Sequence, residues 1–217
     1  MDAETARQII VDYGRRLYQN GLTDSAGGNL SIRLEDRVFI TPRGAAAERH
    51  WNLTASQKLM TDLNGRILAG TGAVSREIAA HLALQQAFYP RISAVMHSHP
   101  ENLRAFYAEA LPLPLVLDDL AAFREVPYCL PAPEGTQALA DAILETLRAA
   151  EDLDTNGAAA CLLPGHGLFV IARDMARAYE VTDLLDLNAY ALTGKEADLE
   201  RNPARLRALR AADRKKY

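Results

Sequence analysis

Two histidines, His97 and His99, are separated by one residue in the segment MHSHP. Side chains alternate between the two faces of an extended strand, so both imidazoles point the same way and can bind one metal ion. A third imidazole, His166, lies in PGHG, where glycines let the backbone turn sharply. Three neutral imidazoles with an open fourth position form a typical catalytic zinc site. Paired histidines are also common as ordinary polar strand residues, and this spacing alone leaves both interpretations open.

Glu77 lies at the start of an apolar, helix-like pattern that follows Ser75. A carboxylate there interacts favourably with the helix dipole, which by itself accounts for the residue. The functional interpretation is that Glu77 faces the metal and transfers a proton, with its pKa tuned by burial and by the adjacent cation. His81 follows one turn later on the same face, and we interpret it as a core or supporting residue rather than a ligand. His50 is interpreted as a surface residue.

Three segments carry hydrogen-bond donors that suit an anionic ligand: GGNLS at 27–31, TPRG at 41–44 and SR at 75–76. Backbone N–H groups beside glycine, small hydroxyls and amides bind phosphate, and arginine adds bidentate charge. Each segment alone is an ordinary turn or helix cap. Their combination in one chain indicates a phosphate or carboxylate pocket.

The composition limits the class of protein. The chain has 217 residues, 49% of them hydrophobic, and a formal net charge of -4, so it can bury one core and has no basic footprint for nucleic acid. Cys129 and Cys161 lack a metal-binding spacing and are expected to be reduced thiols. No secretory signal is apparent, and no apolar run approaches the roughly 18 residues of a membrane span. We therefore expect a cytoplasmic protein without membrane partners.

Hydrophobic periodicity and turn residues predict the elements that must position these side chains. Ser75 is expected to cap a helix, and Asn64-Gly65 to form a type I′ turn between two strands. Because helices and hairpins interleave without repeated βαβ units, we expect one domain over 1–217, of mixed α/β (α+β-like) class, with a mostly antiparallel sheet covered by helices. Helices are predicted at 5–18, 75–88, 102–109, 137–148 and 174–192, with a basic terminal helix or tail at about 200–217, and strands at 29–34, 37–40, 59–68 (two), 92–97, 159–163 and 168–171.

Taken in order, five segments resemble the class II aldolase/adducin family of fuculose-phosphate aldolases, rhamnulose-phosphate aldolases and ribulose-phosphate 4-epimerases: GLTDSAGGNLSIRL, FITPRG, SREIAAH, AVMHSHP and LLPGHGLFVIARDMARAYEVTDLLD. The resemblance covers nearly the whole chain. It implies that His97, His99 and His166 bind Zn²⁺, or another divalent metal such as Mn²⁺ or Co²⁺. It also implies that Glu77 is the catalytic acid/base. The phosphate pocket is assigned by the same resemblance to Gly28, Asn29, Arg43, Gly44, Ser75 and Arg76.

The sequence departs from the family's pattern at two of these positions. Arg43 and Arg76 stand where small hydroxyl residues are usual, so the pocket is expected to be more cationic and to hold either phosphate or carboxylate. The tyrosine that fuculose-phosphate aldolases place after the central strand has no clean equivalent, since Pro131 occupies its position and Tyr128 lies nearby. The corresponding acid of the epimerases falls close to Asp118 and Asp119.

The resemblance implies a zinc-dependent aldolase that cleaves a phosphorylated keto sugar, or a related keto acid, through a metal-stabilised enediolate. A 4-epimerase, a dehydratase and a decarboxylase of the same family use the same enediolate and remain alternatives. A non-catalytic adducin-like interaction domain would not need three coordinating histidines together with Glu77. The resemblance further implies a homotetramer with active sites at subunit boundaries, where a neighbour supplies residues of the 118–128 region or the C-terminal helix.

Overall fold

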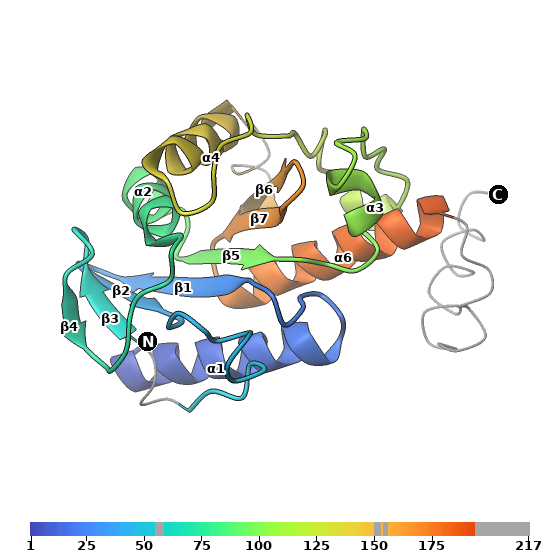
Figure 1. Cartoon of the computed structure of the whole chain (residues 1–217). Coiled ribbons are helices and arrows are strands. Elements are labelled where there is room, and N and C mark those ends of the chain that lie inside the picture. The colour runs from blue at the N-terminus through green and yellow to red at the C-terminus, as the bar shows by residue number, and fades with distance from the viewer. Residues whose placement is uncertain (55–58, 150–152, 154–155, 194–217) are drawn as a thin grey trace.

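The computed structural model in Figure 1 describes residues 1–54, 59–149, 153 and 156–193. The predicted basic terminal helix or tail lies outside the described residues. The helices are α1 (Ala3–Gln19), α2 (Ile78–Phe88), α3 (Arg104–Tyr107), α4 (Gln137–Ala149) and α6 (Met175–Thr193), with a 3-10 helix η2 (Asp118–Leu120). The strands are β1 (Asn29–Leu34), β2 (Arg37–Ile40), β3 (Leu59–Asp62), β4 (Ile67–Ala69), β5 (Ala94–Ser98), β6 (Ala158–Leu163) and β7 (Gly167–Ala172).

The described strands form one seven-stranded sheet in the order β4-β3-β2-β1-β5-β7-β6. Every pair of neighbouring strands is antiparallel, which confirms the predicted sheet type. β1 and β2 form one hairpin, β3 and β4 a second, and β6 and β7 a third, whereas the longer segment between Ile40 and Leu59 joins β2 to β3. β5 lies between the part of the sheet made of β1 to β4 and the β6–β7 hairpin, and it pairs with β1 on one side and β7 on the other.

Helices cover both faces of the sheet (Figure 1). α1 and α6 pack on one face, against β1, β5 and β7, whereas α2 and α4 pack together over β5 and β6 on the other. Alternation along β5 separates the two cores: Met96 packs on the α1 and α6 side, and Val95 on the α2 and α4 side. His97 lies two residues after Val95, so its side chain points to the face that α2 covers. None of the described helices is long and apolar enough to span a membrane.

The start of α2 differs from the prediction. The helix begins at Ile78, and Glu77 rather than Ser75 occupies the N-cap position. The Ser75 hydroxyl accepts a hydrogen bond from the Glu77 amide at 3.3 Å, and the Ser75 carbonyl accepts one from the Ile78 amide at 3.2 Å. These local bonds stabilise a tight turn before the helix instead of a cap on it.

The turn between β3 and β4 is not of type I′. That type needs positive φ at both central residues, but only Gly65 has it, at +81°. The Asp62 carboxylate accepts hydrogen bonds from the amides of Asn64 and Arg66, at 3.0 and 2.9 Å, and so stabilises a longer turn.

α3 starts later than predicted because a distant residue holds the chain before it. The Asp186 carboxylate of α6 accepts hydrogen bonds from the backbone and side-chain amides of Asn102, at 2.8 and 2.7 Å. These bonds hold Asn102 outside the helix, which starts at Arg104. Cys129 and Cys161 are free and buried, as expected of structural thiols.

Candidate metal centre

His97 is fixed by β7, the neighbour of its own strand. Its Nδ1–H donates to the carbonyl of Leu168 at 3.0 Å, and its ring stacks on Phe169 with 4.6 Å between centroids. The side chain is 1% exposed. Burial, together with His99 and His166, keeps the pKa of His97 well below its ordinary value. The imidazole is therefore neutral, and its Nε2 lone pair is free to bind a cation.

His99 follows β5 immediately and is oriented by Asp24. Its Nδ1–H donates to Asp24 Oδ1 at 3.1 Å, so its Nε2 also carries a lone pair. The two Nε2 atoms of His97 and His99 lie 3.2 Å apart. Two lone pairs facing each other repel, but two nitrogens on one tetrahedral zinc ion would be separated by roughly 3.3 Å. The pair is therefore arranged for a shared cation.

His166 reaches the same point from the turn between β6 and β7. Gly165 has φ +67°, and a Cβ at Gly167 would come within 2.6 Å of the Ser98 carbonyl oxygen, so this turn needs both glycines. One nitrogen from each of His97, His99 and His166 lies within 4.8 Å of the others. These donors fit a divalent transition metal such as zinc.

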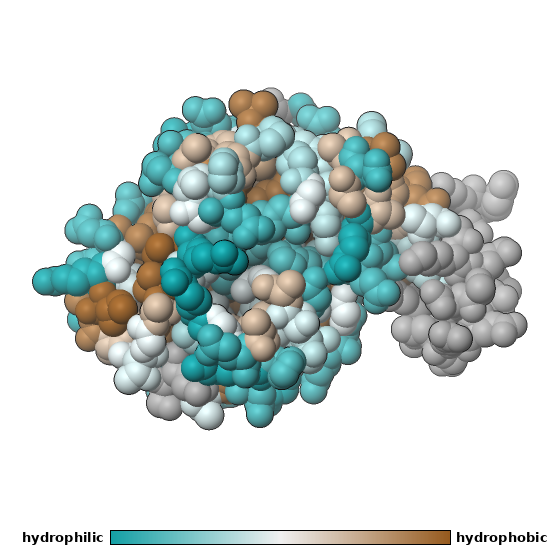
Figure 2. Space-filling model, viewed as in Figure 1, coloured by the Kyte–Doolittle hydropathy of each residue, from teal (hydrophilic) through white to brown (hydrophobic). Residues whose placement is uncertain are grey.

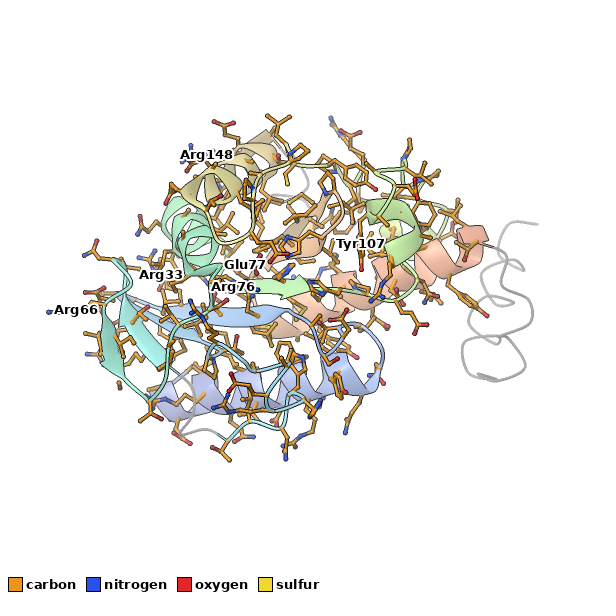
Figure 3. The ribbon with its side chains drawn as sticks, viewed as in Figure 1. Arg33, Arg66, Arg76, Glu77, Tyr107 and Arg148 are labelled. Carbon is orange, nitrogen blue, oxygen red and sulfur yellow. The ribbon has the colours of Figure 1, made fainter. Side chains whose placement is uncertain are left out.

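The Glu77 carboxylate lies against this cluster. Figure 3 shows Glu77 next to Arg76, close to β5. Oε2 is 3.4 Å from His97 Nε2, and Oε1 is 3.4 Å from His166 Nε2. Oε1 is buried and accepts no hydrogen bond within the described part of the chain. Burial raises the pKa of Glu77 to about 7; the hydrogen bond from Asn29 opposes this shift, and the Glu134 charge adds to it. Such a carboxyl can accept and release a proton near neutral pH.

The cluster lies in a cavity of about 650 Å³, in a mainly hydrophilic part of the surface between the α2 and α4 layer and α1 (Figure 2). Its lining includes segments before and at the start of β1, after β2, before α2, at the end of β5 and between β6 and β7. The ten residues predicted to bind the metal, carry the proton or form the phosphate pocket all line it: Gly28, Asn29, Arg43, Gly44, Ser75, Arg76, Glu77, His97, His99 and His166. Their roles in binding and catalysis remain predictions.

The cavity is lined by carboxylates as well as by the two predicted arginines. Glu48 and Glu134 line it beside the two arginines and Glu77. Arg76 Nη2 lies 3.5 Å from Glu134 Oε2, and both side chains are more than half exposed. These carboxylates partly offset the arginines, although an exposed ion pair is weak and an incoming anion can displace it.

The 118–128 region lies away from the cavity within a single chain. Asp118 and Asp119 are exposed on η2, and the Tyr128 hydroxyl donates to the Leu111 carbonyl at 2.8 Å. Neither these three residues nor Pro131 lines the cavity. His50 is exposed. His81 is a buried residue of α2 and does not line the cavity.

Sequence reasoning missed Asp24 and Glu134. The carboxylate of Asp24 also accepts hydrogen bonds from the Ala26 and Gly27 amides, and it binds Arg104 at 2.9 Å. Partial burial opposes its ionisation, but the interaction with His99 and the hydrogen bonds from these amides keep the pKa of Asp24 below its ordinary value. An acidic residue three positions before a glycine pair was the available signal for Asp24. Glu134, in an ordinary PEG turn, offered none.

We expect Asp24→Asn to weaken metal binding by roughly 10–100-fold, because removal of a carboxylate that orients a ligand histidine has effects of this size. Competition with a chromogenic chelator would measure the affinity. Asp36→Asn is the matched control, since the Asp36 side chain is 81% exposed and pairs with its neighbour Arg37 at 3.7 Å, away from the histidines. Equal affinities in the two variants would show that Asp24 does not support the site.

Comparison with known proteins places this arrangement in a family. Residues 8–192 match the family described as Class II Aldolase and Adducin N-terminal domain. The chain is 30% identical over 190 residues to a 3-oxo-tetronate 4-phosphate decarboxylase of Haemophilus influenzae, covering 84% of each chain. It is 30% identical over 196 residues to an L-fuculose phosphate aldolase of Escherichia coli, covering 87% of this chain and 85% of that one.

A solved structure gives the same result for the fold. An L-fuculose 1-phosphate aldolase superposes with a TM-score of 0.76 at 23% identity, over 98% of this chain and 97% of that one. The family match over residues 8–192 covers most of the chain. The chain belongs to the class II aldolase and adducin N-terminal domain family.

Proposed function

We propose that the protein is a metal-dependent aldolase that cleaves a phosphorylated keto sugar. One observation carries the proposal: the buried Glu77 carboxylate lies 3.4 Å from the Nε2 atoms of both His97 and His166. In this proposal His97, His99 and His166 hold Zn²⁺, or Mn²⁺ or Co²⁺ in its place. The L-fuculose phosphate aldolase relative supports this reaction class.

Glu77 is the proton carrier in the proposed reaction. A divalent ion in this position supplies Lewis acidity, which polarises the substrate's carbonyl and neighbouring hydroxyl oxygens. When the carbon–carbon bond breaks, the hydroxyl on the leaving carbon gives its proton to the Glu77 carboxylate, and that fragment departs as an aldehyde. The other fragment keeps the electron pair as an enediolate, and Glu77 returns a proton to its carbon to give a ketone such as dihydroxyacetone phosphate. The cleavage is neutral in protons overall.

The remaining predicted residues would hold the phosphate. The Ser75 hydroxyl accepts from the Glu77 amide, which leaves its own O–H to donate to a ligand. The amides near Gly28 and Gly44 and the Asn29 side chain add neutral donors, and Arg43 and Arg76 add charge. A phosphate dianion would compete with Glu134 for Arg76.

A decarboxylase is the second candidate. The Haemophilus influenzae relative is named for a substrate with both a carboxylate and a phosphate, and two arginines line the cavity here. Loss of carbon dioxide from a 3-oxo acid would leave the same kind of enediolate, to which Glu77 would again deliver a proton.

The test presents the metal-reconstituted protein separately with L-fuculose 1-phosphate and 3-oxo-tetronate 4-phosphate. An aldolase releases aldehyde and dihydroxyacetone phosphate from the first, whereas a decarboxylase releases one carbon dioxide from each molecule of the second. Formation of an epimer or a dehydrated product would reassign the reaction within the family. Metal-loaded protein that turns over neither these two compounds nor any other phosphorylated keto sugar or keto acid in a wider screen would contradict both candidates.

We further propose a homotetramer with active sites at subunit boundaries. Leu111, Val116 and Leu130 are 48%, 40% and 73% exposed, and they flank the 118–128 region in the sequence. Exposed apolar side chains close together are typical of an interaction surface. Sedimentation should give four copies per particle at micromolar concentration. A monomer would overturn this proposal and remove Asp118, Asp119 and Tyr128 from the site.

A further inference from the structure

A series of buried hydrogen bonds runs beneath α2 and ends at Glu77. Glu77, His81 and Gln85 are spaced one helical turn apart and face the sheet, where Asn29 and Ser31 of β1 point toward them. All five are buried. A helix packed on a sheet normally buries apolar side chains here, so this polar layer needs an explanation.

The partners of these groups determine the direction of each bond. The Asn29 Nδ2 group donates to Glu77 Oε2 at 2.7 Å, so the Asn29 carbonyl oxygen faces His81 Nε2, at 2.5 Å. A carbonyl oxygen only accepts, and His81 must therefore donate from Nε2. Burial lowers the pKa of His81 to about 3, so the ring is neutral and its Nδ1 accepts from the Ser31 hydroxyl at 2.7 Å.

The series starts at a fixed backbone group. The Gln85 amide donates to the Ser31 hydroxyl oxygen at 3.3 Å and to the Ser93 carbonyl at 3.2 Å. Because the Ser93 carbonyl cannot donate, it fixes the orientation of the Gln85 amide. Every donor in the series then points toward Glu77, and no member can reverse alone without placing two acceptors or two donors together.

We propose that His81 is a positioning residue that holds the Asn29 side-chain amide with its NH₂ group toward Glu77 and the cavity. Asn29 lines the cavity and His81 does not, so His81 acts only through Asn29. The recorded bond to Glu77 uses one of the two NH₂ hydrogens, and the second can bind a substrate oxygen. The role of that second hydrogen rests on the proposed function; the positioning itself does not.

Two amide substitutions separate the functions of the two ring nitrogens. In His81→Gln the side-chain amide reaches the position of Nε2 and can still donate to Asn29. In His81→Asn the shorter side chain reaches only the position of Nδ1 and keeps the contact with Ser31. The variants differ by one methylene, so their polarity is matched. We expect His81→Asn to lower kcat/KM by roughly 10–100-fold and His81→Gln by no more than about threefold.

A second background distinguishes positioning from a general structural role. With Asn29→Ala, His81 has no amide to orient, so the difference in kcat/KM between His81→Gln and His81→Asn should disappear. If that difference persists without Asn29, or if the two variants are equally active in the wild-type background, the proposal is wrong.

A readout independent of turnover uses metal-free protein labelled with ¹⁵N. Long-range proton–nitrogen correlations should show His81 in the neutral Nε2–H form, and the Asn29 NH₂ signals should move in His81→Asn but stay in place in His81→Gln. An Nδ1–H form in the wild-type protein overturns the proposal even if no variant folds. If the wild-type protein turns over none of the phosphorylated substrates but shows these signals, the proposed function fails and the positioning role stands.

Discussion

Replacing Glu77 by glutamine is expected to lower kcat by roughly 10²–10⁴-fold, the usual cost of losing a general acid or base, while the metal content stays unchanged. Glutamine has the same shape and can still accept the hydrogen bond from Asn29, but it cannot carry a proton. Turnover and metal per chain should be measured on the same preparation. Glu145→Gln, at an exposed position on α4, is the matched control.

Two other outcomes would reassign the residue. Loss of metal in Glu77→Gln would make Glu77 mainly a ligand. Full activity with full metal content would show that it carries no proton. The proton carrier would then be sought at Glu134, which lines the same cavity, or at Asp118, Asp119 and Tyr128 of a neighbouring subunit.

The same variant has a second expected effect, on the stability of the metal-free protein. The pKa of Glu77 is about 7 in the fold against an ordinary 4.5, so the folded state holds the proton more tightly than the unfolded chain. This contribution to stability is fully present below pH 4.5 and is lost as the pH rises through 7. Glu77→Gln should therefore raise the free energy of unfolding at pH 8, relative to wild type, by on the order of 3 kcal/mol.

Urea unfolding in the presence of a chelator at pH 4.5 and pH 8 would measure this difference. If the difference in the free energy of unfolding between Glu77→Gln and wild type is the same at both pH values, folding does not raise the pKa of Glu77.

Replacing His99 by alanine is expected to lower the metal affinity by more than roughly 100-fold and to abolish metal-dependent turnover. This loss of affinity is larger than the one expected when a residue that only orients a ligand is replaced. His99 suits this test better than His97. The side chain of His97 is 1% exposed and stacks on Phe169, so its loss would also disturb the core, whereas His99 is 12% exposed.

The matched control is His50→Ala, which removes an exposed imidazole that does not line the cavity. Metal per chain after dialysis and the affinity from chelator competition are the two measurements. Equal loss of metal in both variants would show that the proposed ligand set is wrong.

The sequence predicted the sheet well because its signals are local. The hairpin of β1 and β2 has the predicted bounds, since alternating side chains and a short turn specify it within twelve residues. The start of α2 was misplaced because Ser75 can bond either to a helix or to its own turn. α3 was overestimated because Asp186, 84 residues from Asn102, decides where it starts.

The candidate site was accessible from sequence only where the side chain itself carries the chemistry. Imidazoles, a carboxylate and anion-binding turns can be recognised by type and spacing, and those residues do line one cavity. Asp24 and Glu134 are ordinary turn residues until the fold brings them to His99 and Arg76. The orientation of His81 likewise depends on partners from β1, 50 and 52 residues away in sequence.

The position of β5 between two separately formed parts of the sheet has a consequence for folding. The β1–β2 and β3–β4 hairpins need only short loops, and β2 and β3 are joined by the longer segment between Ile40 and Leu59, whereas β7 must return to β5 across about seventy residues, which carries a larger loop-closure entropy. We expect the hairpins to form early and the β5–β7 pairing late. His166 arrives with the late pairing, so during synthesis and refolding the complete ligand set would exist only in chains whose two halves have already joined.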